Sequence, residues 1–222
     1  MHLQTRKFGF EILLVSLLVM IVVPGLVPSQ HSSLLLSVMS LGIILSSLYL
    51  AAKDKATIVI GTVMALLILI TNWPGSPIPE FERIIFNSTL NSIFLAYVCV
   101  HIFKFITSAT SPSSQLIYAA LCMYLLMGMV WSFIYVLLVA IDPNAIKLAL
   151  VIDWGDNSRD VFAEMYYFSF VTLTTLGYGD VLPISRIARS LATLEAVIGQ
   201  LYLAVVIASL VGIQINRRTT DK

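Results

Sequence analysis

Long apolar runs dominate the pattern of hydrophobic and polar positions along this chain. Six of them approach the roughly 20 residues that a helix needs to cross the hydrocarbon core of a bilayer. They cover residues 8–27, 34–52, 56–73, 88–106, 116–141 and 187–213. The pattern therefore predicts an all-α membrane protein with six transmembrane helices.

The segment between the fifth and sixth runs contains a shorter apolar stretch that cannot cross the membrane. Residues 142–160 are polar and acidic, whereas residues 161–174 are apolar enough to enter the bilayer. A helix of these 14 residues would reach only about 21 Å, against a hydrocarbon core of about 30 Å. Non-helical backbone at membrane depth must be buried in protein or line a watery cavity. We therefore expect a re-entrant pore helix that helps to enclose a pore.

The six residues after this stretch, TLGYGD at 175–180, have the chemistry of an ion filter. An ion that leaves water needs its hydration oxygens replaced, and rings of backbone carbonyls can replace them. Successive carbonyls point the same way if alternate residues are left-handed, which costs glycine little and other residues about 1–2 kcal/mol. Gly177 and Gly179 stand at alternate positions, as this arrangement requires. The Thr175 hydroxyl can add the innermost ligand.

The stretch from Val171 to Asp180, VTLTTLGYGD, resembles the pore-helix end and filter of the potassium-channel family. The resemblance runs from the fifth span onward, since residues 194–204 are similar to the inner helix of small bacterial members. It implies a homotetramer in membrane lipid that conducts K⁺ passively, with K⁺ as the permeant ion and no organic cofactor. The ion-binding filter positions that it implies are Thr175, Leu176, Gly177, Tyr178 and Gly179, the first four as K⁺ ligands.

Three departures from the family pattern lie near the filter. Leu176 replaces the usual valine, which keeps the carbonyl but changes the packing behind it. Val171 stands where some members carry a buried glutamate, so no second carboxyl accompanies Asp180. Tyr167 and Phe168 occupy the place of a common aromatic pair. We expect Tyr167 to donate a hydrogen bond to Asp180, the alternative being that it points toward lipid or a neighbouring helix.

Three further residues are candidates for supporting or moving the filter. Thr174 ends the predicted pore helix and is a candidate support. Glu195 is a carboxyl within the bilayer, where charge is costly, so it either braces the filter from behind or occupies a shallow, hydrated position. Gly199 lies twenty residues after Gly179 and is either a gating hinge or a site of close helix packing.

The chain divides into a four-span unit, residues 1–110, and a pore unit, residues 111–222. With the termini inside, eight lysines and arginines face the cytoplasm and five face outward, which favours cytoplasmic termini in a cell membrane. The expected parts of the pore unit are an outer helix at 116–141, a pore helix at 161–174, a filter at 175–180 and an inner helix at 187–213.

Composition and charge narrow the classes of function. Hydrophobic residues make up 59% of the chain and charged residues 11%, and a net charge of +1 indicates no nucleic-acid partner. Cys99 and Cys122 lie in apolar runs, so we expect free thiols without a disulfide partner. The three histidines stand apart, which argues against an enzyme, and a single re-entrant motif argues against a transporter. The remaining alternative is a non-selective cation channel or a silent subunit on the same scaffold.

We predict weak voltage dependence, because the fourth run contains His101 and Lys104 but no arginine. Steep voltage sensors carry about 3–4 gating charges per subunit. Replacing Lys104 by Gln should therefore leave the conductance–voltage relation of the reconstituted protein nearly unchanged. A steep relation that K104Q abolished would contradict this expectation.

Overall fold

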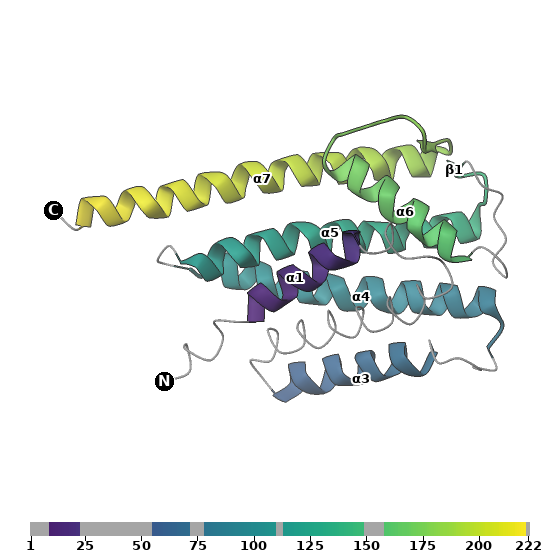
Figure 1. Ribbon diagram of the computed structural model, residues 1–222, viewed down its shortest axis with the longest axis horizontal. Helices are drawn as coiled ribbons and strands as arrows, with labels where there is room; N and C mark the ends of the chain where they lie inside the picture. Colours follow the sequence, from purple (N-terminus) through teal and green to yellow (C-terminus); the bar gives the residue numbers. More distant parts are fainter. Residues whose placement is uncertain (1–8, 23–54, 72–77, 110–112, 149–157, 221–222) are drawn as a thin grey trace. The chain divides into compact units, whose positions relative to one another are not determined.

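The computed structural model describes residues 9–22, 55–71, 78–109, 113–148 and 158–220, and most of them are helical (Figure 1). Among the described residues the helices are α1 (Gly9–Val22), α3 (Lys55–Thr71), α4 (Glu80–Thr107), α5 (Ser114–Ile141), α6 (Ser158–Leu173) and α7 (Arg186–Thr220). The strands are β1 (Ile146–Lys147) and β2 (Leu182–Pro183).

Three of the described helices are long and apolar enough to cross a membrane. They are α4 from Phe81 to Thr107, α5 along its whole length and α7 from Arg186 to Ser209. α1 is a shorter apolar helix, and α3 overlaps the third predicted span. The second predicted span, residues 34–52, lies outside the described residues. The chain is therefore a multi-pass membrane protein, while the total of six spans stays a prediction.

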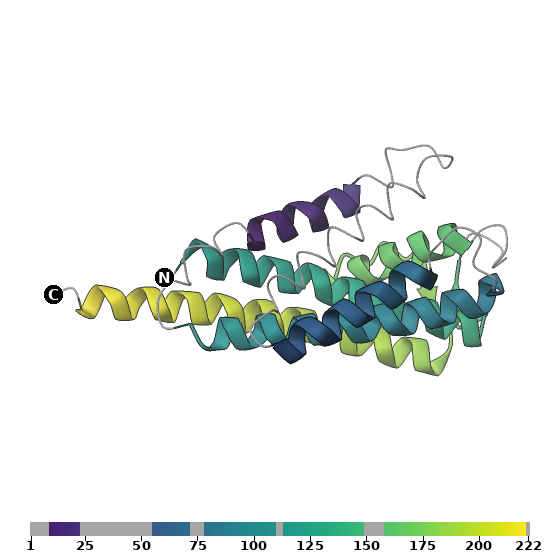
Figure 2. The ribbon, with the colours of Figure 1, turned by 90° about the horizontal axis from the view of Figure 1, so that it is seen from below.

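Three helices have bounds that differ from those that the sequence predicted. α4 begins at Glu80 rather than at residue 88. α7 continues to Thr220 rather than ending at residue 213, and Figure 2 shows it as a long helix that ends in yellow. α6 begins at Ser158, three residues before the predicted start of the pore helix. It ends at Leu173, one residue before the predicted end. Hydropathy marks where a helix enters hydrocarbon, whereas polar end turns satisfy their backbone groups in water and extend the helix beyond the core. The observed bounds of α4, α6 and α7 therefore replace the predicted ones.

The chain forms two compact units, which are described separately. The first combines residues 1–65, 97–126 and 212–222. Within it, the ring centroids of Phe10 and Phe105 lie 5.1 Å apart. The buried Cys122 thiol donates to the Phe10 carbonyl oxygen at 3.4 Å. Ring packing and this thiol therefore join α1 to α4 and α5.

The second unit combines residues 66–96 and 127–211 and contains the pore helix. Its core lies where α5, α6, the start of α7 and the loop after α5 meet. The buried members are Tyr135, Val136, Val139, Ala145, Ile146, Val161, Met165, Phe168 and Ala188. The Tyr135 ring meets the Phe168 ring edge-on, with centroids 4.9 Å apart. Aromatic and aliphatic packing therefore holds the pore helix against α5.

Hydrogen bonds fix the segment that leads from the filter to α7. β1 and β2 pair antiparallel, and the Ala145 carbonyl accepts from the Ile184 and Ser185 N–H groups at 2.8 and 3.0 Å. The Ser185 hydroxyl oxygen then accepts from the Ala188 N–H at 3.0 Å, as an N-cap of α7. The chain that returns from the filter is therefore held at a defined point before α7 begins.

Candidate functional site

The pore helix α6 ends in a Schellman cap. The Leu176 N–H donates to the Val171 carbonyl at 2.9 Å, and the Thr175 N–H donates to the Thr172 carbonyl at 3.0 Å. This pair of bonds defines the motif, in which the residue after the helix is left-handed. That residue is Thr175, with a φ of 57°. The helix is therefore terminated by the first residue of the predicted filter.

Left-handed dihedrals recur at every second residue of the predicted filter. Thr175, Gly177 and Gly179 have φ values of 57°, 58° and 81°. The glycine spacing predicted this conformation at Gly177 and Gly179, and the structure has it at both. It was not predicted at Thr175, because positive φ is a rare conformation for a β-branched residue. The alternation lets successive carbonyls from Thr175 onward point to one side of the chain.

The predicted filter lies at the surface of the chain. Every residue from 174 to 180 is exposed, and the exposed fractions of Leu176 and Tyr178 are 54% and 68%. The Thr174 hydroxyl donates to the Phe170 carbonyl at 2.6 Å, so it strengthens the last turn of α6. One copy of the chain therefore presents its filter outward, with two large apolar side chains left uncovered beside it.

Asp180 ends the filter in a small hydrogen-bonded network. The Tyr167 hydroxyl on α6 donates to Asp180 Oδ2 at 2.7 Å, and the Val181 N–H donates to Oδ1 at 3.0 Å. The Tyr167 and Tyr178 rings are nearly parallel, with centroids 6.5 Å apart. The hydrogen bond expected from the sequence is present, and the alternative in which Tyr167 points away from Asp180 is wrong. The last filter residue is thus tied to the helix that precedes the filter.

This end of the filter is acidic. The hydrogen bond from Tyr167 lowers the pKa of Asp180 below its ordinary value of 3.8, and the same bond raises the pKa of Tyr167 to about 12. Burial raises the pKa of Glu164, and the charges of Asp180 and Asp160 raise it further. Tyr167 therefore stays a donor and Asp180 an acceptor around neutral pH. Carboxylates gathered at one end of a pore raise the local concentration of cations.

Glu195 lies buried among α5, α6 and α7. Its exposed fraction is 0%, so the shallow, hydrated position considered from the sequence is wrong. The Tyr135 hydroxyl on α5 lies 2.6 Å from Oε2, and the Ser169 hydroxyl on α6 lies 2.6 Å from Oε1. Sequence reasoning did not find Tyr135 or Ser169, because a single tyrosine or serine in an apolar helix is common. Only the packing of three helices selects them.

Two glycines let α6 approach its neighbours closely. A Cβ on Gly199 of α7 would lie 2.7 Å from the Leu173 carbonyl oxygen, at the end of α6. A Cβ on Gly128 of α5 would lie 2.8 Å from the Phe170 ring. α7 is helical through Gly199. Close packing, one of the two roles expected for Gly199, thus has a defined contact, and the hinge role stays a prediction.

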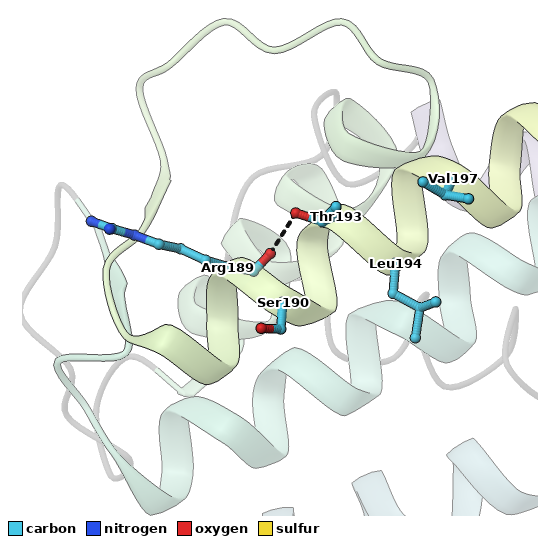
Figure 3. Close-up of a pocket in the computed structure, with 5 residues that line it drawn as sticks. All are labelled: Arg189, Ser190, Thr193, Leu194 and Val197. Atoms are coloured by element: carbon cyan, nitrogen blue, oxygen red, sulfur yellow. Dashed lines mark hydrogen bonds between the residues drawn. The ribbon is translucent and has the colours of Figure 1, made fainter.

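An open hollow of about 490 Å³ lies along the start of α7 (Figure 3). Its lining residues are Arg189, Ser190, Thr193, Leu194 and Val197. The Thr193 hydroxyl donates to the Arg189 carbonyl at 2.9 Å, and Arg189 Nε donates to the Pro183 carbonyl at 3.2 Å. The Thr193 hydroxyl and Arg189 Nε therefore both donate hydrogen bonds within the chain. The helix continues with exposed apolar side chains at Leu201 and Val205.

Comparison with known proteins points to the same part of the chain. Residues 116–214 match the family model described as ion channel, and they contain the filter and nearly all of α5. This part of the chain is therefore similar to ion channel domains. Over 58 residues the chain is 45% identical to the inward rectifier potassium channel Kirbac3.1 of Paramagnetospirillum magnetotacticum. That match covers 26% of this chain and only 19% of the relative, about a fifth of its length. No solved structure matches the chain.

We predict that the Tyr167–Asp180 hydrogen bond slows inactivation of the channel. Y167F removes the donor and keeps the ring, whereas D180N removes the charge of the acceptor. Each single variant should inactivate several-fold faster, and the double variant should add little, because both changes break one contact. Current decay in the two single variants and the double variant measures this. Strictly additive effects would show that the two side chains do not interact, and F168L controls for altered packing.

The same contact predicts a dependence on acid pH. Because the pKa of Asp180 is depressed, its carboxylate accepts from Tyr167 at neutral pH, and the bond is lost only as pH falls through that lowered value. Inactivation of the wild type should therefore accelerate only in strongly acid solution, below the ordinary pKa of 3.8. Y167F should show no such acceleration. An onset near neutral pH would assign the effect to another group.

Gly199→Ala is predicted to destabilise the channel, because the new Cβ would lie 2.7 Å from a backbone oxygen that can move only with α6. Overpacking of this kind typically costs about 1–3 kcal/mol. Unfolding in mixed micelles should show a loss that grows from Ala to Val at this position. Altered gating with unchanged stability in both variants would favour the hinge instead.

Proposed function

We propose that four copies of this chain form a potassium-selective channel that conducts K⁺ passively across the cell membrane. In this proposal the carbonyls of Thr175, Leu176, Gly177 and Tyr178, together with the Thr175 hydroxyl, bind K⁺, and Gly179 completes the filter. The observation that carries it is the left-handed alternation that begins at Thr175, directly after a helix too short to span the membrane. No organic cofactor takes part.

Three further observations support K⁺ as the permeant ion. The match to Kirbac3.1 is a match to a protein named as an inward rectifier potassium channel. The C-terminal end of α6, which carries roughly half a negative charge, lies at the start of the filter. Glu164 and Asp180 bring acidic groups to the other end of the filter. Cations are therefore favoured at both ends of the path.

Assembly into a homotetramer is supported by what one subunit leaves uncovered. A ring of carbonyls needs several filter strands around one axis, and each chain supplies one. Leu176 and Tyr178 are more than half exposed. An exposed apolar row on α7, at spacings that place it on one helix face, consists of Leu194, Val197, Leu201 and Val205. Neighbouring copies would cover these surfaces, and lipid would cover the remaining apolar faces.

The proposed channel has the membrane topology that the sequence predicted. The chain crosses six times, its termini are cytoplasmic, and residues 1–110 form a four-span unit that does not sense voltage. Residues 111–222 form the pore unit, in which Gly199 is the candidate hinge. Thr174, Asp180, Tyr167 and Glu195 support the filter.

Potassium selectivity is the first expected outcome. Purified protein in planar bilayers should give reversal potentials close to the K⁺ equilibrium potential under opposed K⁺ and Na⁺ gradients. G177A should lose this selectivity, because alanine resists a φ of 58° by about 1–2 kcal/mol. Equal permeability of K⁺ and Na⁺ in the wild type would favour a non-selective cation channel. The absence of current would favour a silent subunit.

Tetramerisation is the second expected outcome. Native mass spectrometry in mild detergent should detect a species of four times 24.5 kDa. Replacing the exposed Leu201 on α7 by Asp should reduce this species, whereas replacing Ile12 on α1, which is also exposed, should not. A conducting monomer or dimer would refute the architecture.

A further inference from the structure

Three buried oxygen–oxygen contacts link α5, α6 and α7 around Glu195. Tyr135 Oη lies 2.6 Å from Glu195 Oε2, and Ser169 Oγ lies 2.6 Å from Glu195 Oε1. Ser169 Oγ also lies 2.8 Å from the Gly128 carbonyl oxygen. The three side chains are each 0% exposed. The contacts thus run from α5 through α7 and α6 back to α5, out of reach of solvent.

The number of protons available decides how these contacts are made. Oxygens this close need a proton between them, because O–H···O hydrogen bonds span about 2.5–3.0 Å and two bare lone pairs at that distance repel. The hydroxyls of Tyr135 and Ser169 supply one proton each, and the Gly128 carbonyl supplies none. Three contacts share these two protons. The third proton has to come from the carboxyl group of Glu195.

We propose that Glu195 is held as a neutral carboxylic acid and acts as a positioning residue for the pore helix. Its Oε1–H donates to Ser169, Ser169 donates to the Gly128 carbonyl, and Tyr135 donates to Oε2. Every proton then has one acceptor. Within the part of the chain that the structure describes, both hydrogen-bond partners of the carboxyl are neutral hydroxyls, and an ionised carboxylate buried without a paired cation is costly.

The position of this network in the helices gives it a consequence for the filter. Glu195 and Gly199 are four residues apart on α7, and their contacts on α6, Ser169 and Leu173, are also four residues apart. Successive turns of α7 therefore meet successive turns of α6. Leu173 is the last residue of α6, two residues before Thr175. The network fixes how far α6 can slide along α7, and hence where the filter begins; this consequence rests on the proposed function.

Infrared difference spectroscopy of the reconstituted full-length protein tests the protonation state without relying on conduction. The wild type at neutral pH should show the carbonyl stretch of a protonated carboxylic acid. E195Q should remove this band, and Y135F and S169A should shift it, because each changes one hydrogen bond to the acid. D160N, which replaces an exposed carboxylate, should leave the band unchanged. A wild type without this band, or a band that persists in E195Q, would overturn the proposal.

Single-channel recording tests the positioning role. E195A removes both hydrogen bonds of the carboxyl and should lower the open fraction by about tenfold or more, since each bond of ordinary strength accounts for up to about tenfold. Glutamine at the same position should restore most of the loss, since its amide can donate to Ser169 and accept from Tyr135. If E195Q is as impaired as E195A, the group acts as a charge and the proposal is wrong. If the wild type conducts no K⁺, the proposed function fails, while the infrared result still decides the state of Glu195.

Discussion

The end of α6 is the constraint on which this region depends. The last carbonyls of a helix have no helical partners, and in the membrane position that we propose for α6 no lipid group can supply them. The N–H groups of Thr175 and Leu176 satisfy the Thr172 and Val171 carbonyls in a Schellman cap. The cap requires a left-handed residue, and a threonine adopts that conformation only where the surrounding structure imposes it. Since the same conformation repeats at Gly177, the helix cap and the filter are one continuous backbone feature.

A strained turn of this kind persists only if α6 cannot move, and the packing around α6 supplies the restraint. Helices in a bilayer gain little from the hydrophobic effect when they associate, so they depend on close van der Waals contact and on interhelical hydrogen bonds. Gly128 and Gly199 provide the first by removing side chains where α5 and α7 meet α6. Glu195 provides the second through its contact with Ser169. The contacts follow one another along α6, at Ser169, Phe170 and Leu173.

The two ends of the filter are restrained in different ways. Behind its start the Glu195–Ser169 contact is buried, whereas at its end the Tyr167–Asp180 bond is open to water and to screening by salt. The pairing of β1 with β2 and the Ser185 cap then hold the returning chain. The end near Asp180 is therefore the more labile one, and changes in solution conditions act there first.

The sequence by itself determined the features that depend on composition and on single residues. Apolar length predicted α4, α5 and α7 and separated the short α6 from them, and the glycine spacing predicted positive φ, which is a property of glycine itself. The Tyr167–Asp180 bond was predictable because the two residues lie only 13 positions apart, at the ends of one motif. Hydropathy missed the helix ends, since polar turns outside the core carry no apolar signal. Tertiary structure alone decided the left-handed Thr175 and the burial of Glu195. Its partners lie 60 and 26 positions away on other helices, and no periodicity in the sequence relates positions that only helix packing brings together.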